Sequence, residues 1–510
     1  MRAIGGGDTL PVPMPLPAHL EAIRTRVEGY AREFGLDFFD TVFECVSYDE
    51  MNMIAAYGGF PTRYPHWKFG MEYEHLGKSY TYGLSKIYEL VINNDPSYAY
   101  LMTSNADVDQ KLVMAHVYGH VDFFKNNFAF AHTNRKMMDT MANHGTRVRR
   151  YIDRYGVEKV ESFIDRVLSI ENLVDRHAPY IKRRDDRPVE VDRDAEIMDV
   201  PRLKTDREYM QRYINPQAFI DEQRKRLQEE RERQRRFPEH PERDVMQFLL
   251  ENAPLESWEH DILATLRDEA YYFAPQGQTK IMNEGWASFW HTTIMTQRAL
   301  DPNEIIDYAD HHAGTMGVQP GSINPYKLGL ELFRDIEERW NKGRFGKEWD
   351  ECDSLARRKA WDTQAGQGRQ KIFEVRRHYN DVTFIDEFLT PDFVRQQKMF
   401  TYGFNNKSGN WEITDREFKA VKQKLLTSLT NFGQPNVQVV DGNFENRGEL
   451  LLKHQFEGVP LKQDYMRDTL RNLASMWARP VGIVTRSDDK LVLVRFDGQD
   501  YKETEIETEP

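Results

Sequence analysis

The sequence has few cysteines, no long hydrophobic run and no excess of positive charge. Only Cys45 and Cys352 occur among its 510 residues, which excludes a disulfide framework and favours a reducing compartment. It has no run of about 18 apolar residues, and the Gly- and Pro-rich start of the chain has no apolar signal core. We therefore expect a cytoplasmic protein without a membrane insertion or an export signal.

The charge balance bears on the kind of partner. Acidic residues number 82 and basic residues 69, which gives a formal net charge of -13 and argues against nucleic acid as a main partner. Hydrophobic residues make up 40% of the chain and aromatic residues 12%. A chain of this length and composition is expected to fold into two or three domains, each with its own core.

Hydrophobic periodicity predicts a mainly helical protein. Apolar residues recur at helical spacing from Ala18 to Phe34, in residues 107–124 and 137–177, and in much of 245–426. Two β-rich runs around an Asn-Asn-Asp-Pro turn predict a hairpin over residues 88–101. After Asn431, runs at 436–440, 449–454, 480–484 and 490–494 are typical of strands, with one helix at 462–478. The predicted fold class is mainly α with a small β-hairpin, plus a C-terminal α+β domain.

The same pattern predicts four parts of the chain. Residues 183–244 are highly charged and punctuated by prolines, which is typical of an exposed insertion or linker. This charged segment separates a helical part at 1–182, which carries the hairpin, from a second helical part at 245–430. Residues 431–510 form the predicted small α+β domain.

Two histidines are the first residues that suggest chemistry. His116 and His120 are four residues apart on a predicted helix, so their side chains lie on one face and can converge on one ion. The alternative is that both histidines are structural, each bonded to a backbone group or a carboxylate. The spacing by itself does not choose between a metal site and a structural role.

A second motif supplies an acid. Glu284 lies in the string Asn283-Glu284-Gly285-Trp286-Ala287, within an aromatic helix where an unpartnered carboxylate would be costly to bury. Together with His116 and His120, Glu284 gives the ligand set of a zinc peptidase, namely two histidines from one helix and a glutamate from a later one. We therefore predict a divalent metal such as zinc on a zinc-peptidase-like helical core.

The position of the general base differs from that of such peptidases. They carry a glutamate directly after the first histidine, and here that residue is Val117. The predicted protein is therefore a metal-dependent hydrolase whose base lies elsewhere or a pseudoenzyme that binds a ligand. His291, Glu269 and Tyr118 are predicted to support the ligands or to contact a substrate. Weaker candidates, which surface positions also explain, are Asp310, His311, His312 and the pair Glu171 and His177.

Several long strings resemble one bacterial family. Residues 116–127, 282–291 and 321–329, together with the loop 64–70 and the C-terminal 447–450, are similar to the stage V sporulation protein R (SpoVR) family. The resemblance spans nearly the whole chain. It implies a cytoplasmic protein associated with spore cortex formation, or with stationary-phase and stress physiology in bacteria that form no spores.

The resemblance also implies partners, but it supplies no reaction. It implies a functional link to a PrkA-type serine protein kinase and a companion protein. Two hypotheses therefore stand: a metal-binding protein on a peptidase-like scaffold, and a non-catalytic regulatory or scaffold protein in that kinase pathway. Metal analysis discriminates between the two.

Overall fold

The computed structural model describes residues 16–81, 89–181, 216–223, 225–226, 237–317, 322–405, 409–487 and 490–508. It divides the chain into two compact units. Unit 1 comprises residues 1–161 and 272–433, and unit 2 comprises residues 162–271 and 434–510. The charged insertion predicted at 183–244 lies for the most part outside the described residues.

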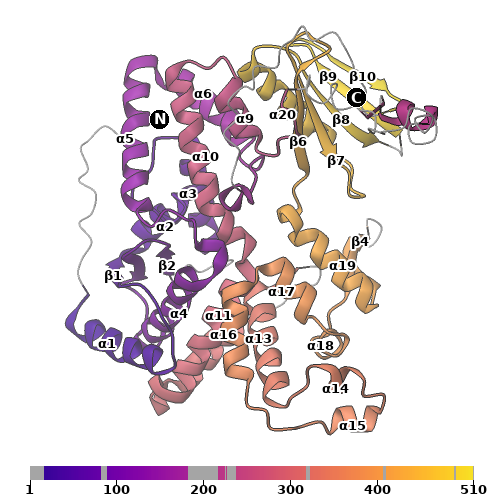
Figure 1. Ribbon diagram of the computed structural model, residues 1–510. Helices are drawn as coiled ribbons and strands as arrows, with labels where there is room; N and C mark the ends of the chain where they lie inside the picture. The colour runs from indigo at the N-terminus through magenta and orange to yellow at the C-terminus, as the bar shows by residue number, and fades with distance from the viewer. Residues whose placement is uncertain are drawn as a thin grey trace, which may run out of the picture. The chain divides into compact units, whose positions relative to one another are not determined.

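Helices make up most of unit 1 (Figure 1). Their bounds are α1 (Ala18–Glu33), α2 (Tyr48–Ala56), α3 (Trp67–Thr81), α4 (Asp107–Asn126), α5 (Met137–Tyr155), α11 (Lys280–Ile294), α12 (Ile305–Thr315), α13 (Pro325–Asn341), α14 (Lys347–Asp350), α15 (Leu355–Lys359), α16 (Gly368–His378), α17 (Asp381–Phe388), α18 (Pro391–Gln396) and α19 (Phe418–Leu429).

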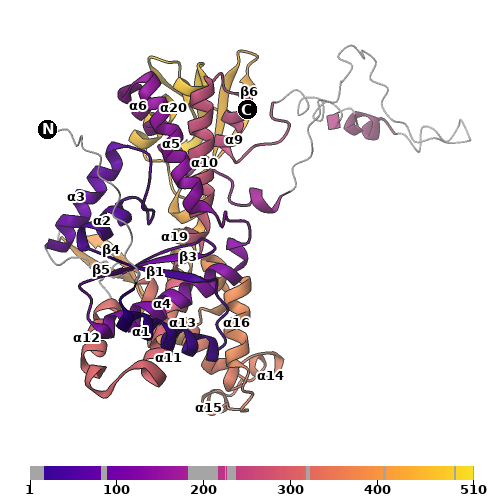
Figure 2. The same ribbon diagram turned by 90° about the vertical axis from the view of Figure 1, so that its left-hand side faces the viewer.

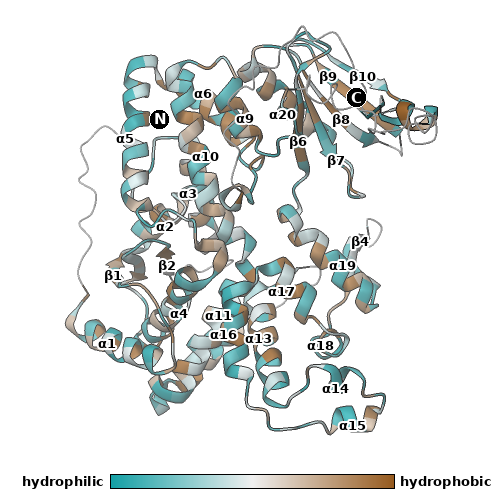
Figure 3. Cartoon of the chain, in the orientation of Figure 1, coloured by the Kyte–Doolittle hydropathy of each residue, from teal (hydrophilic) through white to brown (hydrophobic). Residues whose placement is uncertain are grey.

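A three-stranded sheet lies beside these helices. The predicted hairpin is confirmed as β2 (Glu89–Ile92) and β3 (Ser97–Met102), which pair antiparallel. Sequence analysis did not predict β1 (Thr41–Val46), which pairs parallel with β3 on its other edge, as Figure 2 shows. The apolar composition of β1 and β2 is visible in Figure 3, where α5 by contrast is largely hydrophilic. The hairpin of β4 (Thr401–Asn405) and β5 (Asn410–Asp415) was also not predicted.

Helix α11 packs between α4 and α13 (Figure 1), and glycines allow both close approaches. A Cβ atom added at Gly119 of α4 would lie 2.7 Å from Cα of Ala287 in α11. On the other side, a Cβ atom at Gly285 of α11 would lie 2.4 Å from Cα of Gly329 in α13. Because no side chain larger than a methyl group lies at these crossings, α11 is held close to both neighbours.

A carboxylate from another helix caps the start of α11. The first N–H groups of a helix have no partner within the helix. Asp381, at the start of α17, accepts hydrogen bonds from the backbone N–H of Ile281 at 2.8 Å and of Met282 at 2.9 Å. This contact fixes the end of α11 that lies next to Glu284.

Unit 2 contains the C-terminal α+β structure. Its five-stranded sheet has the order β10-β9-β8-β7-β6, in which β7 and β8 are parallel and the other neighbours antiparallel. The elements are β6 (Asn436–Phe444), β7 (Glu449–Gln455), α20 (Gln463–Trp477), β8 (Val481–Ser487), β9 (Lys490–Phe496) and β10 (Tyr501–Glu505). Helix α9 (Val245–Asn252) also belongs to this unit, while α6 (Val157–Leu168) and α10 (Ser257–Gln278) run through both ranges.

The predicted fold class is confirmed: the protein is mainly α with a C-terminal α+β region. The predicted boundary at residue 431 lies close to the passage from unit 1 to unit 2 after Gly433. Unit 2 also includes residues 162–271, and the independent folding of residues 431–510 stays a prediction. Among the described helices, none is both long and apolar enough to cross a membrane.

Candidate metal centre

Helices α4 and α11 bring the three predicted ligands together. His116 and His120 are buried, with 3% and 6% of their surface exposed, and they lie one turn apart on α4. Glu284 of α11 faces both rings, and the side chain is 17% exposed. Within the part of the chain that the structure describes, these residues form a group whose ligand atoms all lie within 4.8 Å of one another.

The spacing of the ligand atoms fits a shared ion. Oε2 of Glu284 lies 3.4 Å from Nε2 of His120 and 3.6 Å from Nε2 of His116. Both distances exceed the usual 2.7–3.2 Å of an N–H···O hydrogen bond. Two atoms that each lie about 2.0–2.1 Å from a tetrahedral zinc ion are about 3.3–3.4 Å apart. The observed distances are therefore close to those between ligands of one metal ion.

A hydrogen bond sets the orientation of His120. Nδ1 of His120 lies 2.9 Å from Oδ1 of Asn283, the residue that precedes Glu284. The amide oxygen accepts, so Nδ1 carries the proton and the lone pair of Nε2 points toward Glu284. Protein ligands of metals commonly have such a partner on the second ring nitrogen.

His116 lies at the head of a row of histidines. Its Nδ1 is 2.8 Å from Nδ1 of His291, and Nε2 of His291 is 3.4 Å from Nδ1 of His312 in α12. Burial lowers the pKa of His291 well below its ordinary value, and the neighbouring His116 and His312 lower it further. His291 is therefore neutral, and its Nδ1 can accept a hydrogen bond from Nδ1–H of His116 while its own proton stays on Nε2.

Glu284 is the charged member of this cluster. Burial alone would raise the pKa of Glu284, but His116 and His120 outweigh it and hold this pKa well below its ordinary value. Glu284 is therefore ionised across the physiological range. The ring of Tyr326, from α13, stacks against His116 with a centroid distance of 6.1 Å.

The structure places the other predicted residues as follows. Tyr118 is buried and packs against Phe38, with ring centroids 4.6 Å apart. Glu269 is buried in α10 and belongs to unit 2. Nδ1 of His311 lies 2.5 Å from Oδ1 of Asp109, which is at the start of α4. Glu171 and His177 are both exposed.

Neither Val117 nor Asp122 can serve as a general base at this cluster. Val117 is fully buried in the hydrophobic core. Asp122 is fully buried and accepts a hydrogen bond from Nε1 of Trp286 at 2.7 Å, with the guanidinium of Arg376 3.3 Å away. Burial raises the pKa of Asp122 to about 6, although Arg376 and its hydrogen bonds favour the charged form.

Sequence analysis missed the roles of Asn283 and Tyr326. Asn283 stood in the motif that contains Glu284, but nothing in that motif indicated that its side chain bonds His120. Tyr326 stood in the string 321–329, far along the chain from both histidines. Only the crossing of α11 with α4 and α13 brings them to the cluster.

Comparison with known proteins decides the family. A model described as SpoVR like protein matches residues 16–434, and a model of the SpoVR-like C-terminal domain matches residues 435–488. The chain belongs to the SpoVR family. This SpoVR chain is 29% identical over 502 residues to the uncharacterized protein YcgB of Escherichia coli (strain K12), and the match covers 92% of each. The expected family membership is thereby confirmed.

These comparisons assign no reaction to the SpoVR chain. YcgB is itself described as uncharacterized. No solved structure matches this SpoVR protein. What the site can do is therefore argued from its residues.

Proposed function

We propose that this SpoVR protein binds one divalent metal ion, zinc by preference, through Nε2 of His116, Nε2 of His120 and the carboxylate of Glu284. The observation that carries the proposal is the convergence of these atoms, with 3.4 Å and 3.6 Å between the carboxylate oxygen and the two ring nitrogens. Two imidazoles and one carboxylate are a ligand set that zinc accepts.

The surroundings support a metal more than they support a purely structural pair of histidines. A structural histidine can bond a carboxylate, but the 3.4 Å and 3.6 Å from Glu284 to the two rings are longer than such a hydrogen bond. Here His120 uses Nδ1 on Asn283 and His116 uses Nδ1 on His291, so both histidines direct Nε2 toward the ionised Glu284. In metal sites, a hydrogen bond to the second ring nitrogen of a histidine orients the nitrogen that binds the metal in the same way.

The proposed centre has three protein ligands, which leaves room for a small ligand. Three protein ligands with one open position are typical of catalytic zinc, whereas structural zinc has four. When bound, the ion would supply Lewis acidity at this position. Zinc peptidases also need a general base, which is the residue directly after the first histidine ligand. Here that residue is Val117, whose side chain lies in the hydrophobic core. We therefore propose a ligand-binding metal centre without ordinary peptidase activity.

The cellular setting is proposed from the family alone. It comprises a cytoplasmic location and a role in spore cortex formation or in stationary-phase and stress physiology. It also includes the link to a PrkA-type kinase. The rival hypothesis of a non-catalytic regulatory or scaffold protein requires no metal.

Cobalt substitution tests the geometry of the proposed centre. Chelator-treated protein would be titrated with Co²⁺ while visible absorption is recorded, because four-coordinate cobalt absorbs far more strongly than octahedral cobalt. We expect strong bands that saturate at one ion per chain and disappear in His120→Ala. The exposed His378 provides the control, and His378→Ala should leave the bands unchanged. Weak bands that persist in His120→Ala would overturn the proposal.

A further inference from the structure

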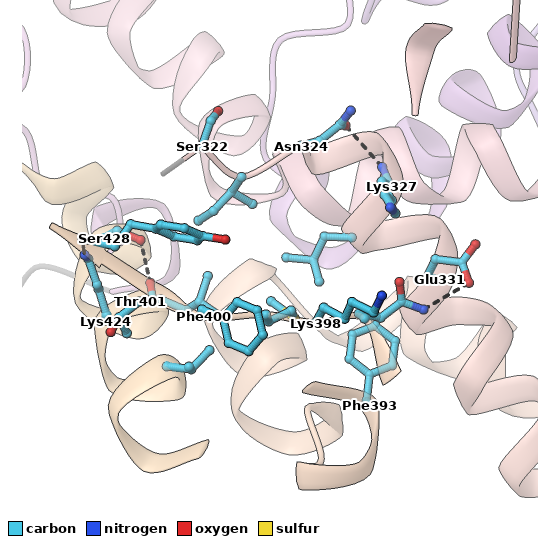
Figure 4. A pocket seen from close by; sticks show the side chains of 17 residues that line it. Ser322, Asn324, Lys327, Glu331, Phe393, Lys398, Phe400, Thr401, Lys424 and Ser428 are labelled. Carbon is cyan, nitrogen blue, oxygen red and sulfur yellow. Dashed lines mark hydrogen bonds between the residues drawn. The ribbon is translucent and has the colours of Figure 1, made fainter. Parts of the chain in front are cut away.

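A cavity in unit 1 lies outside the candidate metal centre. It has a volume of about 400 Å³ and opens between α13, the segment from α18 through β4, and α19 (Figure 4). Its apolar walls include Leu328, Phe393, Phe400, Val421 and Leu425. Pockets that hold small organic ligands measure about 300–1,000 Å³ and are mostly apolar with a few polar groups. The cavity fits that description.

Three lysines from three different walls line the same cavity. They are Lys327 of α13, Lys398 after α18 and Lys424 of α19, and Figure 4 shows Lys424 at the opposite side from the other two. Nζ of Lys424 donates to the backbone carbonyl of Tyr402 at 2.5 Å. Among the described residues, neither Lys327 nor Lys398 forms an ion pair, so their charges are available to a ligand.

The one acid among the described residues of the lining, Glu331, is already engaged. The carboxylate of Glu331 lies 2.9 Å from the guanidinium of Arg334, and its other oxygen accepts from the amide of Gln397 at 3.4 Å. The local charge of the cavity is therefore positive, although the whole chain carries a formal net charge of -13. The lysine charges attract an anion at this place, although the negative charge of the rest of the protein opposes its approach.

We propose that this cavity binds a small amphipathic anion, with an apolar chain against the walls and a carboxylate or phosphate group near Lys327 and Lys398. Burial of the chain supplies affinity at about 25 cal/mol per Å² of apolar surface, and the lysines select the charge of the head group. Lys327 follows Tyr326, which stacks on His116, so the ligand would lie on the helix that borders the metal centre. The binding itself needs no metal.

The test uses ligands that share a ten-carbon chain and differ in the head group. Binding of decanoate, decyl phosphate, decanol and decyltrimethylammonium to the full-length protein would be measured by calorimetry, with acetate as the ligand that lacks a chain. We expect decanoate or decyl phosphate to bind at least about tenfold more tightly than decanol, since a lost charge contact of about 1.4 kcal/mol is tenfold. The stronger of the two anions identifies the head group. Acetate and decyltrimethylammonium should not bind.

Variants then locate the binding. Lys327→Glu and Lys398→Glu should each weaken binding of the anion by about tenfold or more, and Ser428→Trp should abolish it by filling the cavity. Lys419→Glu makes the same charge change at an exposed position of α19 that does not line the cavity, and it should bind as the wild type does. Lys398→Ala gives a second, milder variant should a charge reversal impair folding.

Three results would overturn the proposal. They are the absence of binding by both anions, equal binding of decanol and decanoate, and equal loss of binding in Lys419→Glu and Lys398→Glu. Because every measurement is made with and without chelator, failure of this site is distinguishable from failure of the metal centre.

Discussion

Asn283 orients His120: Oδ1 of the amide lies 2.9 Å from Nδ1 of the ring. The residue directly before one proposed ligand thus positions another, so the motif around Glu284 contributes two functions from adjacent residues. Both belong to α11, which ties the geometry of the site to the packing of that helix.

The first prediction concerns this hydrogen bond. In Asn283→Ala the ring of His120 loses the acceptor for its Nδ1 proton, so metal affinity should fall by about 10–100-fold. Asn283→Asp keeps an acceptor at the same place and should retain most of the affinity. Competition with a chromophoric chelator measures both. Equal affinities for wild type and Asn283→Ala would show that Asn283 does not support a ligand.

The second prediction concerns the crossing of α11 and α13. A methyl group at Gly285 would lie 2.4 Å from Cα of Gly329, so Gly285→Ala should force the helices apart and lower the free energy of unfolding by about 1–3 kcal/mol. Gly29 in α1 is the matched control, because nothing lies within 4 Å of its added Cβ. Gly29→Ala should stabilise by about 0.5–1 kcal/mol. Urea denaturation measures both changes, and a neutral Gly285→Ala would contradict the crossing.

The third prediction concerns pH and Asp381. Burial raises the pKa of Asp381 from 3.8 to about 7, although the N–H groups of Ile281 and Met282 favour its charged form. The folded state therefore binds this proton more tightly than the unfolded state does. The resulting contribution to the free energy of unfolding is at its full value below about pH 4, the unfolded pKa. It is lost as the pH rises through about 7.

Asp381→Asn removes this titration and supplies the comparison. The free energy of unfolding of the wild type, minus that of Asp381→Asn, should fall by about 2–3 kcal/mol between pH 5 and pH 8. Denaturation in the presence of chelator at the two pH values measures the difference and excludes metal effects. A difference that is constant or grows with pH would mean that Asp381 is ionised throughout.

The fourth prediction is the absence of ordinary peptidase activity. A metal-assisted peptidase must move a proton from the attacking water to the leaving amine. Val117 cannot do this, and Asp122 is occupied by Trp286 and Arg376. Zinc-loaded protein should therefore leave casein and fluorogenic peptides intact. Chelator-sensitive cleavage that Glu284→Gln abolishes would show that another residue serves as the base.

The sequence predicted those features that depend on local periodicity. The four-residue spacing of His116 and His120 survives in the structure because it needs only one helix. The hairpin β2–β3 was predictable because its turn carries Asn93, Asn94 and Pro96 between apolar runs. The strands and the helix after residue 431 were recognised for the same reason.

The missed features depend on long-range packing. Strand β1 is short and completes its hydrogen bonds only with β3, more than fifty residues later, so its own sequence gave little signal. Contact between His291 and His116 depends on the approach of α11 to α4, which Gly119 and Ala287 permit. Sequence analysis gave His291 a supporting role beside the ligands but did not indicate its partner, which in the structure is the ring of His116.

Metal content tests the central claim most directly. The protein would be purified without chelator, dialysed against a trace of zinc and analysed by elemental mass spectrometry, next to His116→Ala, His120→Ala, Glu284→Gln and the control His378→Ala. We predict about one zinc ion per folded chain in the wild type and in His378→Ala, and a loss of most of it in the three ligand variants. Wild-type protein without bound metal, or ligand variants that retain the same stoichiometry and affinity, would contradict the proposed centre.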